Sequence, residues 1–231
     1  MSIIFITGGN TGLGFESAKR LKELGHKIYL GCRDEEKGEK AASEIDAESI
    51  VIDVTDDESV KKAVESYRQK EAHLDVLINN AGMPGAQVLP KDITADLMYK
   101  VFNTNVFGIV RVTHEFLPLL KLSENPVIVN VSSGLGSFGQ VLNPEKIESK
   151  VNSVSYCSSK AAASMLTVQY AKGLPNMKVN AVDPGPTNTG GQFTHGTQTI
   201  QEGTDAIVRM ATIGKDGPSG TFSDRNGIIP W

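Results

Sequence analysis

The stretch Ile3-Ile4-Phe5-Ile6-Thr7-Gly8-Gly9-Asn10-Thr11-Gly12-Leu13-Gly14 sets the architecture of this 231-residue chain. Its first part is apolar, as in a strand that is buried on both faces, and its second part is a T-G-x-x-x-G-x-G turn. Glycines at a strand-to-helix turn let the backbone bend sharply and approach a pyrophosphate, while the first amides of the next helix point at the phosphates. Any tight βα turn can use glycine, so the turn alone leaves a purely structural role open.

The rest of the chain repeats this alternation of strand and helix. Short runs rich in Val and Ile predict further buried strands at Lys27–Gly31, Ser49–Asp53, Val76–Asn79, Val127–Val131 and Lys178–Val182. Amphipathic stretches between them predict helices at Glu16–Leu24, Asp34–Ile45, Asp57–Lys70, Leu97–Leu120 and Tyr156–Leu174. The alternation predicts an α/β fold of the Rossmann type: a doubly wound parallel β-sheet flanked by helices on both faces. No linker or repeat divides the sequence, so residues 1–231 are expected to form a single domain.

Composition and charge exclude several classes of protein. The net charge is −4 and no tract is rich in Lys or Arg, so we expect no nucleic acid and no membrane surface as partner. No apolar run approaches the ~18 residues of a membrane span, and the N-terminus lacks a basic leader. We therefore expect a soluble, cytoplasmic protein, in which Cys32 and Cys157 stay reduced. The histidines are scattered without metal-ligand spacing and predict no metal site: His26, His73, His114 and His195.

The end of the second predicted strand, Leu30-Gly31-Cys32-Arg33-Asp34, bears on the kind of nucleotide. An acidic residue about 20 positions beyond the Gly-rich turn would bind a ribose 2′-hydroxyl and exclude a 2′-phosphate. Cys32 stands where that acid is expected, and Arg33 can pair with a phosphate in fork geometry. The segment favours NADP(H), while a solvated Arg33 and an Asp34 that caps the next helix form the structural alternative. Asp34 also keeps NAD open.

Two further strand ends carry polar residues. Asp53-Val54 follows the third predicted strand, where an Asp can accept from an adenine amino group or cap the helix that begins near Asp57. Asn79-Asn80-Ala81-Gly82 ends the fourth, where it either lets the backbone pass close to a cofactor or forms an ordinary Asx turn. Carboxyl ends of parallel strands meet at one edge of the sheet, where ligands bind in open α/β folds.

Tyr156 and Lys160 form a Y-x-x-x-K pair on a predicted helix. Residues i and i+4 share a helix face, so the phenol and the ammonium project together. A nearby cation favours the phenolate and is expected to lower the phenol pKa from about 10, which would let Tyr156 exchange a proton with a substrate oxygen. Such pairs also occur by chance on many helices.

Two more polar residues stand where chemistry is plausible. Ser133, in Ser132-Ser133-Gly134-Leu135-Gly136, follows the fifth strand, where its hydroxyl can bond a substrate oxygen or belong to a plain polar loop. Asn105 lies inside the predicted helix Leu97–Leu120; because Asn is a mediocre helix former, an interior Asn needs a partner or a function. Gly108, one turn later, allows another backbone to come close.

In their order and spacing these motifs resemble the single-domain short-chain dehydrogenase/reductase family over essentially the whole chain. The resemblance rests on Thr7–Gly14, Asn79–Gly82, Asn105, Ser133, Tyr156, Lys160 and Pro184-Gly185-Pro186-Thr187-Asn188-Thr189.

The resemblance implies a role for each catalytic residue. Tyr156 would be the general acid in reduction, and Lys160 would bind the nicotinamide ribose and lower the Tyr156 pKa. Ser133, chosen over Ser132 by its place in S-x-x-G, would orient and polarise the carbonyl. Asn105 would hold a water that links Lys160 to solvent.

NADP(H) is the cofactor that the resemblance and Arg33 together imply. Asn79, Ala81 and Gly82 would line its adenosine–ribose side, while Pro184-Gly185 and Thr189 would border the nicotinamide. The full set of expected cofactor contacts is Gly8, Asn10, Thr11, Gly12, Leu13, Gly14, Arg33, Asp53, Val54, Asn79, Ala81, Gly82, Tyr156, Lys160, Pro184, Gly185, Thr187 and Thr189.

The tail and one insertion narrow the resemblance toward NADPH-dependent carbonyl reductases of the monomeric type. The tail Asp216–Trp231 and the helix start Gln201-Glu202-Gly203 look like theirs, and the tail lacks the Val-Asp-Gly strand of many family members. Ser133 and Tyr156 are also farther apart than is usual in the family, although the monomeric enzymes carry a larger insertion.

We therefore expect an NADPH-dependent oxidoreductase that reduces an aldehyde, ketone or quinone to an alcohol. The alternatives are a non-catalytic, dinucleotide-sensing protein on the same fold and an NAD-dependent alcohol dehydrogenase. An epimerase or dehydratase for nucleotide sugars is disfavoured, because such enzymes carry a longer carboxyl-terminal substrate domain. The expected substrate is small and hydrophobic, since the candidate lining residues are mostly apolar: Met83, Phe138, Val141, Leu142, Gln192 and Phe193, with His195 in the same loop.

The inserted segment Gln140–Ser155 also bears on assembly. Many family members form tetramers by packing two long helices, here Leu97–Leu120 and Tyr156–Leu174, against the same helices of another subunit. The charged segment is expected over or beside the Tyr156 helix, where burying its charges would be costly. The sequence therefore predicts a monomer, with a dimer as the alternative.

Overall fold

The computed structural model describes residues 1–189 and 196–231. In these residues one eight-stranded sheet runs in the order β3-β2-β1-β4-β5-β6-β7-β8. Adjacent strands are parallel except for the antiparallel β7–β8 pair. The strands are β1 (Ile3–Thr7), β2 (Lys27–Cys32), β3 (Glu48–Val51), β4 (Val76–Asn79), β5 (Val127–Val131), β6 (Lys178–Val182), β7 (Phe222–Asp224) and β8 (Gly227–Ile228).

The apolar runs form strands because both faces of the sheet are covered. Every residue of β1, β4 and β5 is buried, and these strands have the bounds that their Val- and Ile-rich runs predict, as does β6. Two strands differ from their predicted bounds: β2 continues one residue further, to Cys32, and β3 runs from Glu48 to Val51, two residues short of the predicted end. Asp53 already belongs to the turn into the next helix.

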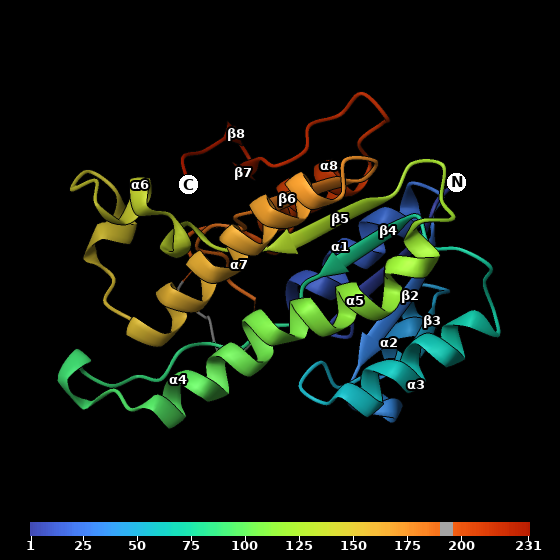
Figure 1. The fold of residues 1–231 in the computed structure, drawn as a ribbon, viewed down its shortest axis with the longest axis horizontal. Coiled ribbons are helices and arrows are strands. Elements are labelled where there is room, and N and C mark those ends of the chain that lie inside the picture. Colours follow the sequence, from blue (N-terminus) through green and yellow to red (C-terminus); the bar gives the residue numbers. More distant parts are fainter. Residues whose placement is uncertain (190–195) are drawn as a thin grey trace.

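Two hydrophobic layers cover the sheet (Figure 1). One joins it to α3 (Asp57–Arg68), α5 (Gly108–Leu120) and α7 (Val154–Gly173), through side chains such as Tyr67 and Phe116. The other joins it to α1 (Gly12–Glu23), α2 (Glu35–Glu44) and α8 (Ile200–Ala211), through side chains such as Leu21 and Ile207. The doubly wound α/β fold predicted from the alternation is confirmed.

The helix predicted over Leu97–Leu120 is wrong as a continuous α-helix. The structure has α4 (Ala95–Phe102), then the π-helical turn η2 (Asn103–Phe107), and then α5. A π turn widens the ring of backbone hydrogen bonds by one residue, and such turns are frequent at functional sites. Asn105 lies in this turn, which accounts for an Asn within an otherwise apolar helix.

The tail does supply a strand, contrary to the expectation from its sequence. Residues Phe222–Asp224 form β7 beside β6, in register from Ala181 to Phe222, and the hairpin returns as β8. The Phe222 ring is fully buried and stacks on Trp231, with 5.4 Å between the ring centroids. Burial of this one aromatic holds the short strand to the sheet without the sequence signature of the family's usual last strand.

The inserted segment lies at the carboxyl end of the sheet and not across the outer face of α7. It forms α6 (Phe138–Val141) and the short helix η4 (Ile147–Lys150), which Figure 1 shows beyond the start of α7. Two more short helices, η1 (Pro90–Asp92) and η3 (Gly134–Gly136), lie at the same end. No helix within the described residues is both long and apolar enough to cross a membrane.

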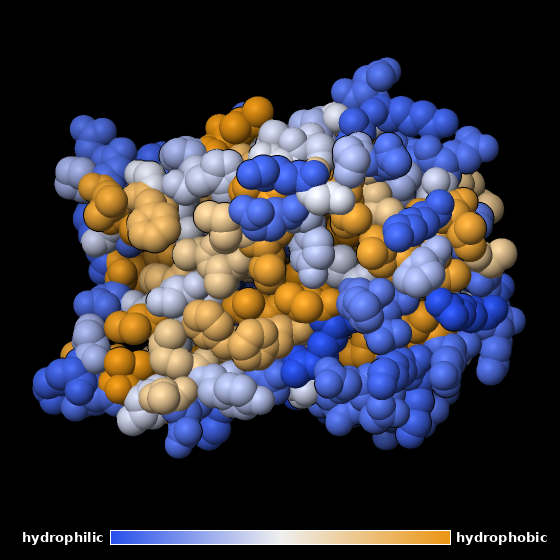
Figure 2. Space-filling view, in the orientation of Figure 1, coloured by the Kyte–Doolittle hydropathy of each residue, from blue (hydrophilic) through white to orange (hydrophobic). Residues whose placement is uncertain are grey.

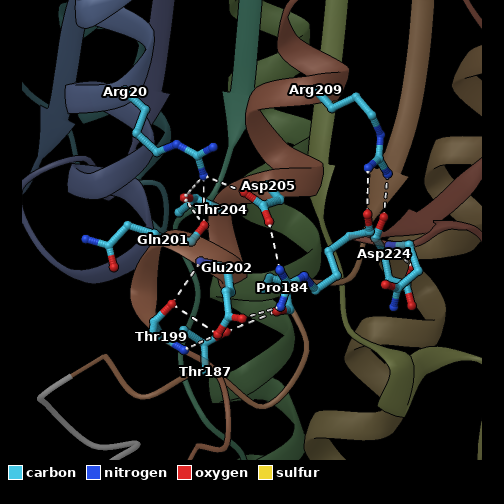
Figure 3. Close-up of polar contacts among 12 residues, drawn as sticks. Arg20, Pro184, Thr187, Thr199, Gln201, Glu202, Thr204, Asp205, Arg209 and Asp224 are labelled. Atoms are coloured by element: carbon cyan, nitrogen blue, oxygen red, sulfur yellow. Dashed lines mark hydrogen bonds and ion pairs between the residues drawn. The ribbon is translucent and has the colours of Figure 1, made fainter.

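Polar contacts anchor the start of α8 (Figure 3). Thr199 and Glu202 form a capping box, in which each side chain accepts from the other residue's amide. Arg20 from α1 donates to the Gln201 carbonyl at 2.7 Å and pairs with Asp205 at 2.9 Å. These contacts fix α8 beside the turn that follows β6.

Candidate active site

The Gly-rich turn joins β1 to α1 as predicted, and its glycines are required by its shape. Gly8 and Gly12 have φ values of +63° and +56°, a region that L side chains rarely adopt. A Cβ on Gly14 would lie 2.3 Å from the Gly8 carbonyl oxygen, so only glycine lets the turn close. Thr11, the residue before α1, makes no side-chain cap, and the first helical turn contains no acidic residue. The first amides of α1 are thus left without a side-chain partner of their own, as an anion site requires.

Asn80 ties this turn to the end of β4. Its side-chain amide donates to the carbonyls of Thr7 at 2.9 Å and Gly8 at 3.1 Å, and the Thr7 hydroxyl accepts from the amides of Asn80 and Ala81. Ala81 therefore lies against the Gly-rich turn, with Gly82 next to it and exposed. The sequence alone does not distinguish Asn80 from Asn79, because nothing in an Asn-Asn pair tells which side-chain amide faces the turn.

Asn79 faces the interior of the protein instead. Its side-chain amide donates to the Asn130 oxygen of β5 at 2.9 Å and to the Thr113 hydroxyl of α5 at 3.2 Å. Asn130 continues this chain of contacts to Thr167 of α7, also at 2.9 Å. The structure thus places the Asn79 side chain in a buried polar ladder between the sheet and two helices. Only its backbone lies at the strand end where a cofactor contact was predicted.

Arg33 and Asp34, the two charged residues that bear on the choice between NADP and NAD, have different surroundings after the end of β2. Arg33 is exposed directly after the strand. Asp34 caps α2, because its carboxylate accepts from the Lys37 amide at 3.1 Å and pairs with the Lys37 ammonium at 2.7 Å. These contacts with Lys37 hold the pKa of Asp34 below its usual value. The Asp34 carboxylate, which left NAD possible as the cofactor, is therefore occupied in capping α2.

Asp53 and Val54 lie at the end of β3 on the same edge. The Asp53 carboxylate accepts from the amide and the hydroxyl of Thr55, at 2.9 and 2.7 Å. The cap of α3 is Asp56, so Asp53 does not serve the helix in the way the structural alternative supposed. Val54 is buried against Gly108, where an added Cβ would lie 3.0 Å from a Val54 methyl carbon. The absence of a side chain at Gly108 thus allows the chain at Val54 to come close, as predicted.

Ser133, Tyr156 and Lys160 come together at the carboxyl ends of β5 and β6. The Lys160 ammonium lies 5.6 Å from the centroid of the Tyr156 ring and donates to the Val131 carbonyl at 2.8 Å. The Ser133 hydroxyl is hydrogen-bonded to the Tyr156 phenol. Ser132, by contrast, donates to the Lys160 carbonyl at 3.0 Å and points into α7. The arrangement leaves Ser133 as the serine that shares the cleft with the phenol.

Burial controls the protonation of this pair. Desolvation raises the pKa of the Tyr156 phenol to about 12, although the Ser133 hydrogen bond lowers it. Desolvation also lowers the pKa of the Lys160 ammonium to about 8. The Tyr156 pKa therefore lies above its ordinary value, and not below it as predicted, because burial disfavours the charged phenolate. Both groups carry their protons at neutral pH.

Asn105 is held by contacts on both sides of its amide. Its oxygen accepts from the Met83 amide at 2.8 Å, and its nitrogen donates to the Met83 carbonyl and the Ser159 hydroxyl, both at 3.0 Å. The Asn105 oxygen and the Lys160 nitrogen both lie within 3.7 Å of the position that a Cβ on Gly82 would take. The π turn thus brings Asn105 to the Tyr156 side of the sheet.

The turn after β6 borders the same cleft. Gly185 has φ +70°, and Thr189 lies beside the Gly-rich turn, 3.7 Å from a Cβ placed on Gly12. Thr187 is buried and donates to the Pro184 carbonyl at 3.0 Å, so its hydroxyl serves the turn itself. Gln192, Phe193 and His195 lie outside the described residues.

Exposed apolar side chains lie in two segments at the carboxyl end of the sheet. Met83 and Val88 come from the segment after β4, Phe138 comes from α6, and Leu142 directly follows that helix. Phe138 and Leu142 are 69% and 76% exposed, so α6 presents apolar surface to solvent and not to the core. Val141, on the same helix, is half-buried.

Known proteins share this architecture. A family model described as short chain dehydrogenase matches residues 2–199. Salutaridine reductase from Papaver bracteatum is 31% identical, over 97% of this chain and 94% of its own. A (+)-neomenthol dehydrogenase from Arabidopsis thaliana is 30% identical, over 96% of each chain. The structure of NADPH-bound carbonyl reductase from chicken fatty liver matches with a TM-score of 0.86 and 26% identity, over 100% of this chain and 99% of that one.

Proposed function

Because this chain belongs to the short-chain dehydrogenase/reductase family, we propose that it is an NADPH-dependent reductase that converts a carbonyl compound to an alcohol. The observation that carries the proposal is the meeting of Ser133, Tyr156 and Lys160 at the carboxyl edge of the sheet. Two relatives are named as a reductase and as a dehydrogenase, which supports an oxidoreductase.

The residues around the Gly-rich turn fit a dinucleotide. The first amides of α1 have no side-chain cap, and the glycine at position 14 keeps the turn narrow. Phosphates would bind at Asn10–Gly14, the adenosine side at Asp53-Val54 and Ala81-Gly82, and the nicotinamide side at Pro184-Gly185. When bound, NADPH supplies the hydride for the reduction.

The protonation states of Tyr156 and Lys160 at neutral pH suit a reduction. Tyr156 holds a proton on its phenol oxygen at neutral pH and would donate it to the substrate oxygen as negative charge develops there. Ser133, bonded to that phenol, would hold the carbonyl oxygen within reach. Lys160, still protonated below a pKa of about 8, would bind the cofactor ribose and favour loss of the Tyr156 proton at the moment of transfer.

NADP is proposed over NAD for two reasons. Arg33 is exposed beyond the end of β2, where its guanidinium can meet a 2′-phosphate in fork geometry. Asp34 is engaged with Lys37 as the cap of α2, so it is a poor acceptor for a ribose 2′-hydroxyl. The chicken carbonyl reductase was solved with NADPH bound, in keeping with this choice.

The substrate is proposed to be a hydrophobic aldehyde, ketone or quinone. Met83, Phe138 and Leu142 are exposed apolar side chains in the segments that follow β4 and β5. Covering such apolar surface with an apolar ligand removes it from water, which lowers the free energy of the complex.

The proposal is tested by following NADPH and NADH oxidation with a panel of activated aldehydes, ketones and quinones. We expect turnover with NADPH, and a much lower rate in Tyr156→Phe with the same substrate. Cofactor binding measured by NADPH fluorescence separates an enzyme from a sensor. Tight NADPH binding without turnover of any carbonyl would support the non-catalytic alternative.

A further inference from the structure

Asp183 is a buried carboxylate next to the proposed catalytic residues, and the reaction as described above does not use it. It follows β6 directly, its side chain is among the buried acidic groups, and the residue is only 7% exposed. A carboxylate at such depth needs hydrogen bonds or an opposite charge to remain ionised. The groups around Asp183 must therefore account for its burial.

Backbone amides from two different turns satisfy this carboxylate. One oxygen accepts from the Gly185 amide at 2.9 Å, in the turn that borders the proposed nicotinamide site. The backbone of Gly134, directly after Ser133, lies against the same carboxylate, and its amide lowers the carboxyl pKa. Asp183 itself is fixed to the sheet, because its own amide donates to the Ser223 carbonyl at 2.8 Å. One side chain thus links the Ser133 turn to the Gly185 turn.

The link needs glycine at position 134. A Cβ there would lie 2.8 Å from an Asp183 carboxylate oxygen, closer than a side chain can come without displacing it. The same point is 3.1 Å from a carboxylate oxygen of Glu148, in η4 of the inserted segment. Two carboxylates therefore converge on the backbone just after Ser133.

Charged groups face Asp183 from three other elements. Glu148 from η4 and Asp224 from β7 are acidic, and with burial they raise the pKa of the Asp183 carboxyl. The negative charge of Asp183 acts on Tyr156 and Lys160 of α7 and raises the pKa of both the phenol and the ammonium. A polar hollow of about 210 Å³ on this side of Asp183 is also lined by Lys146 and Arg225.

We propose that Asp183 is a positioning residue for the reductase reaction proposed above. Its carboxylate holds the turn that follows Ser133 against the turn at Gly185. It also places a negative charge beside Tyr156 and Lys160, so that both keep their protons to higher pH than burial alone would allow. In reduction the phenol must arrive protonated, and a fixed anion beside it favours that state.

The first experiment needs no substrate. In Asp183→Asn the side chain keeps its shape and one acceptor oxygen but loses its charge. Without that charge the Lys160 pKa, about 8 in the native chain, should fall by about one unit. The measurement is an NMR titration of ¹³C-labelled lysine side chains, with the Lys160 signal assigned by its loss in Lys160→Arg. An unchanged titration of Lys160 in Asp183→Asn overturns the electrostatic part of the proposal.

The second experiment uses turnover. The fall of kcat/KM for carbonyl reduction at alkaline pH should begin about one unit lower in Asp183→Asn, since both Tyr156 and Lys160 lose their protons more readily. Asp224→Asn is the matched control, because its carboxylate accepts from Asn226 and Gly227 within its own hairpin. It should keep the native profile. A uniform loss of rate with no shift of the profile, or an equal shift in Asp224→Asn, would contradict the assignment.

Gly134→Ala tests the link from the other turn and stays informative should Asp183→Asn fail to fold. The added methyl group displaces the Asp183 carboxylate from Gly134, so kcat/KM should drop by about ten- to hundredfold. A native rate in this variant overturns the positioning role. Failure of the proposed function looks different: the native chain would reduce no carbonyl, while the Lys160 titration would still report on Asp183.

Discussion

At the scale of single residues, burial of the Tyr156 phenol and the closeness of a cation would shift its pKa in opposite directions. The i, i+4 spacing brings Lys160 near the phenol, 5.6 Å from the ring centroid. Burial nevertheless raises the pKa of the phenol to about 12. In this structure the Tyr156 phenol thus keeps its proton at neutral pH, which suits the general-acid role proposed for it.

Removing the phenol oxygen tests this role. Tyr156→Phe keeps the ring and its packing but loses the transferable proton, so kcat for carbonyl reduction should fall by about 10²-fold or more. NADPH binding should be largely kept. The measurement is steady-state turnover together with NADPH titration, and near-native turnover would falsify the assignment of Tyr156 as the acid.

Arg33 belongs to the same scale, because a single exposed guanidinium is proposed to select the cofactor. Arg33→Ala should raise the KM for NADPH by roughly ten- to hundredfold, the effect of losing a charge-assisted hydrogen bond, and leave the KM for NADH nearly unchanged. Steady-state kinetics with both cofactors measure this. Lys40→Ala, at another exposed position of α2, serves as the control for loss of positive charge on this helix.

Two results would contradict the role of Arg33. One is an equal loss for both cofactors in Arg33→Ala, which would indicate a structural effect. The other is a native preference for NADH.

At the scale of elements, the start of α8 shows how capping positions a cleft wall. The carboxylate of Glu202 accepts from the Thr199 amide and pairs with Arg225, and these contacts hold its pKa at about 2. Gly203 packs on Thr187, where a Cβ would lie 2.2 Å from the Thr187 hydroxyl. The helix therefore begins in close contact with the turn after β6.

Thr199→Ala removes one half of the capping box. The variant should lose about 1 kcal/mol of unfolding free energy, as N-cap substitutions typically do. For a chain of this size that corresponds to a fall of about 2–4 °C in Tm. Thermal unfolding followed by circular dichroism measures it. Gln201→Ala, in the same helical turn, is the control, and an equal loss in both variants would mean that the cap is not the cause.

At the scale of the whole molecule, the position of the inserted segment changes the expectation for assembly. The monomer was predicted because charged residues of Gln140–Ser155 were expected over or beside the α7 helix. The structure places them at the carboxyl end of the sheet, and Figure 2 shows pale and orange side chains over the outer face of α5 and α7. Exposed apolar side chains on α4, η2, α5 and α7 include Tyr99, Phe107, Val110 and Met165.

An open apolar face of this kind favours association. We therefore expect light scattering at micromolar concentration to give a mass above the 24.8 kDa of one chain. Val110→Glu should return the protein to a single chain without loss of fold, while Ile228→Glu, an exposed apolar residue on β8, should not change the mass. A native mass of 24.8 kDa would instead support the monomer predicted from the sequence.

What the sequence determined by itself is local in origin. Alternation of apolar runs with amphipathic stretches predicted the sheet, because strand and helix periods are properties of neighbouring residues. The bounds of β1, β4, β5 and β6 followed from this pattern. The i, i+4 spacing also placed Tyr156 and Lys160 on one helix face before any packing was known.

Only the tertiary structure decided what depends on partners from distant elements. Whether Asn79 or Asn80 faces the Gly-rich turn is set by Asn130 and Thr113, which lie far along the chain. The Tyr156 pKa depends on how deeply the fold buries the phenol, and a pattern of residue types holds no measure of depth. Asp183 reads as an ordinary residue before a Pro-Gly turn until folding brings Gly134 against it. Contact between remote segments, and the dielectric that it creates, is the information that one-dimensional spacing lacks.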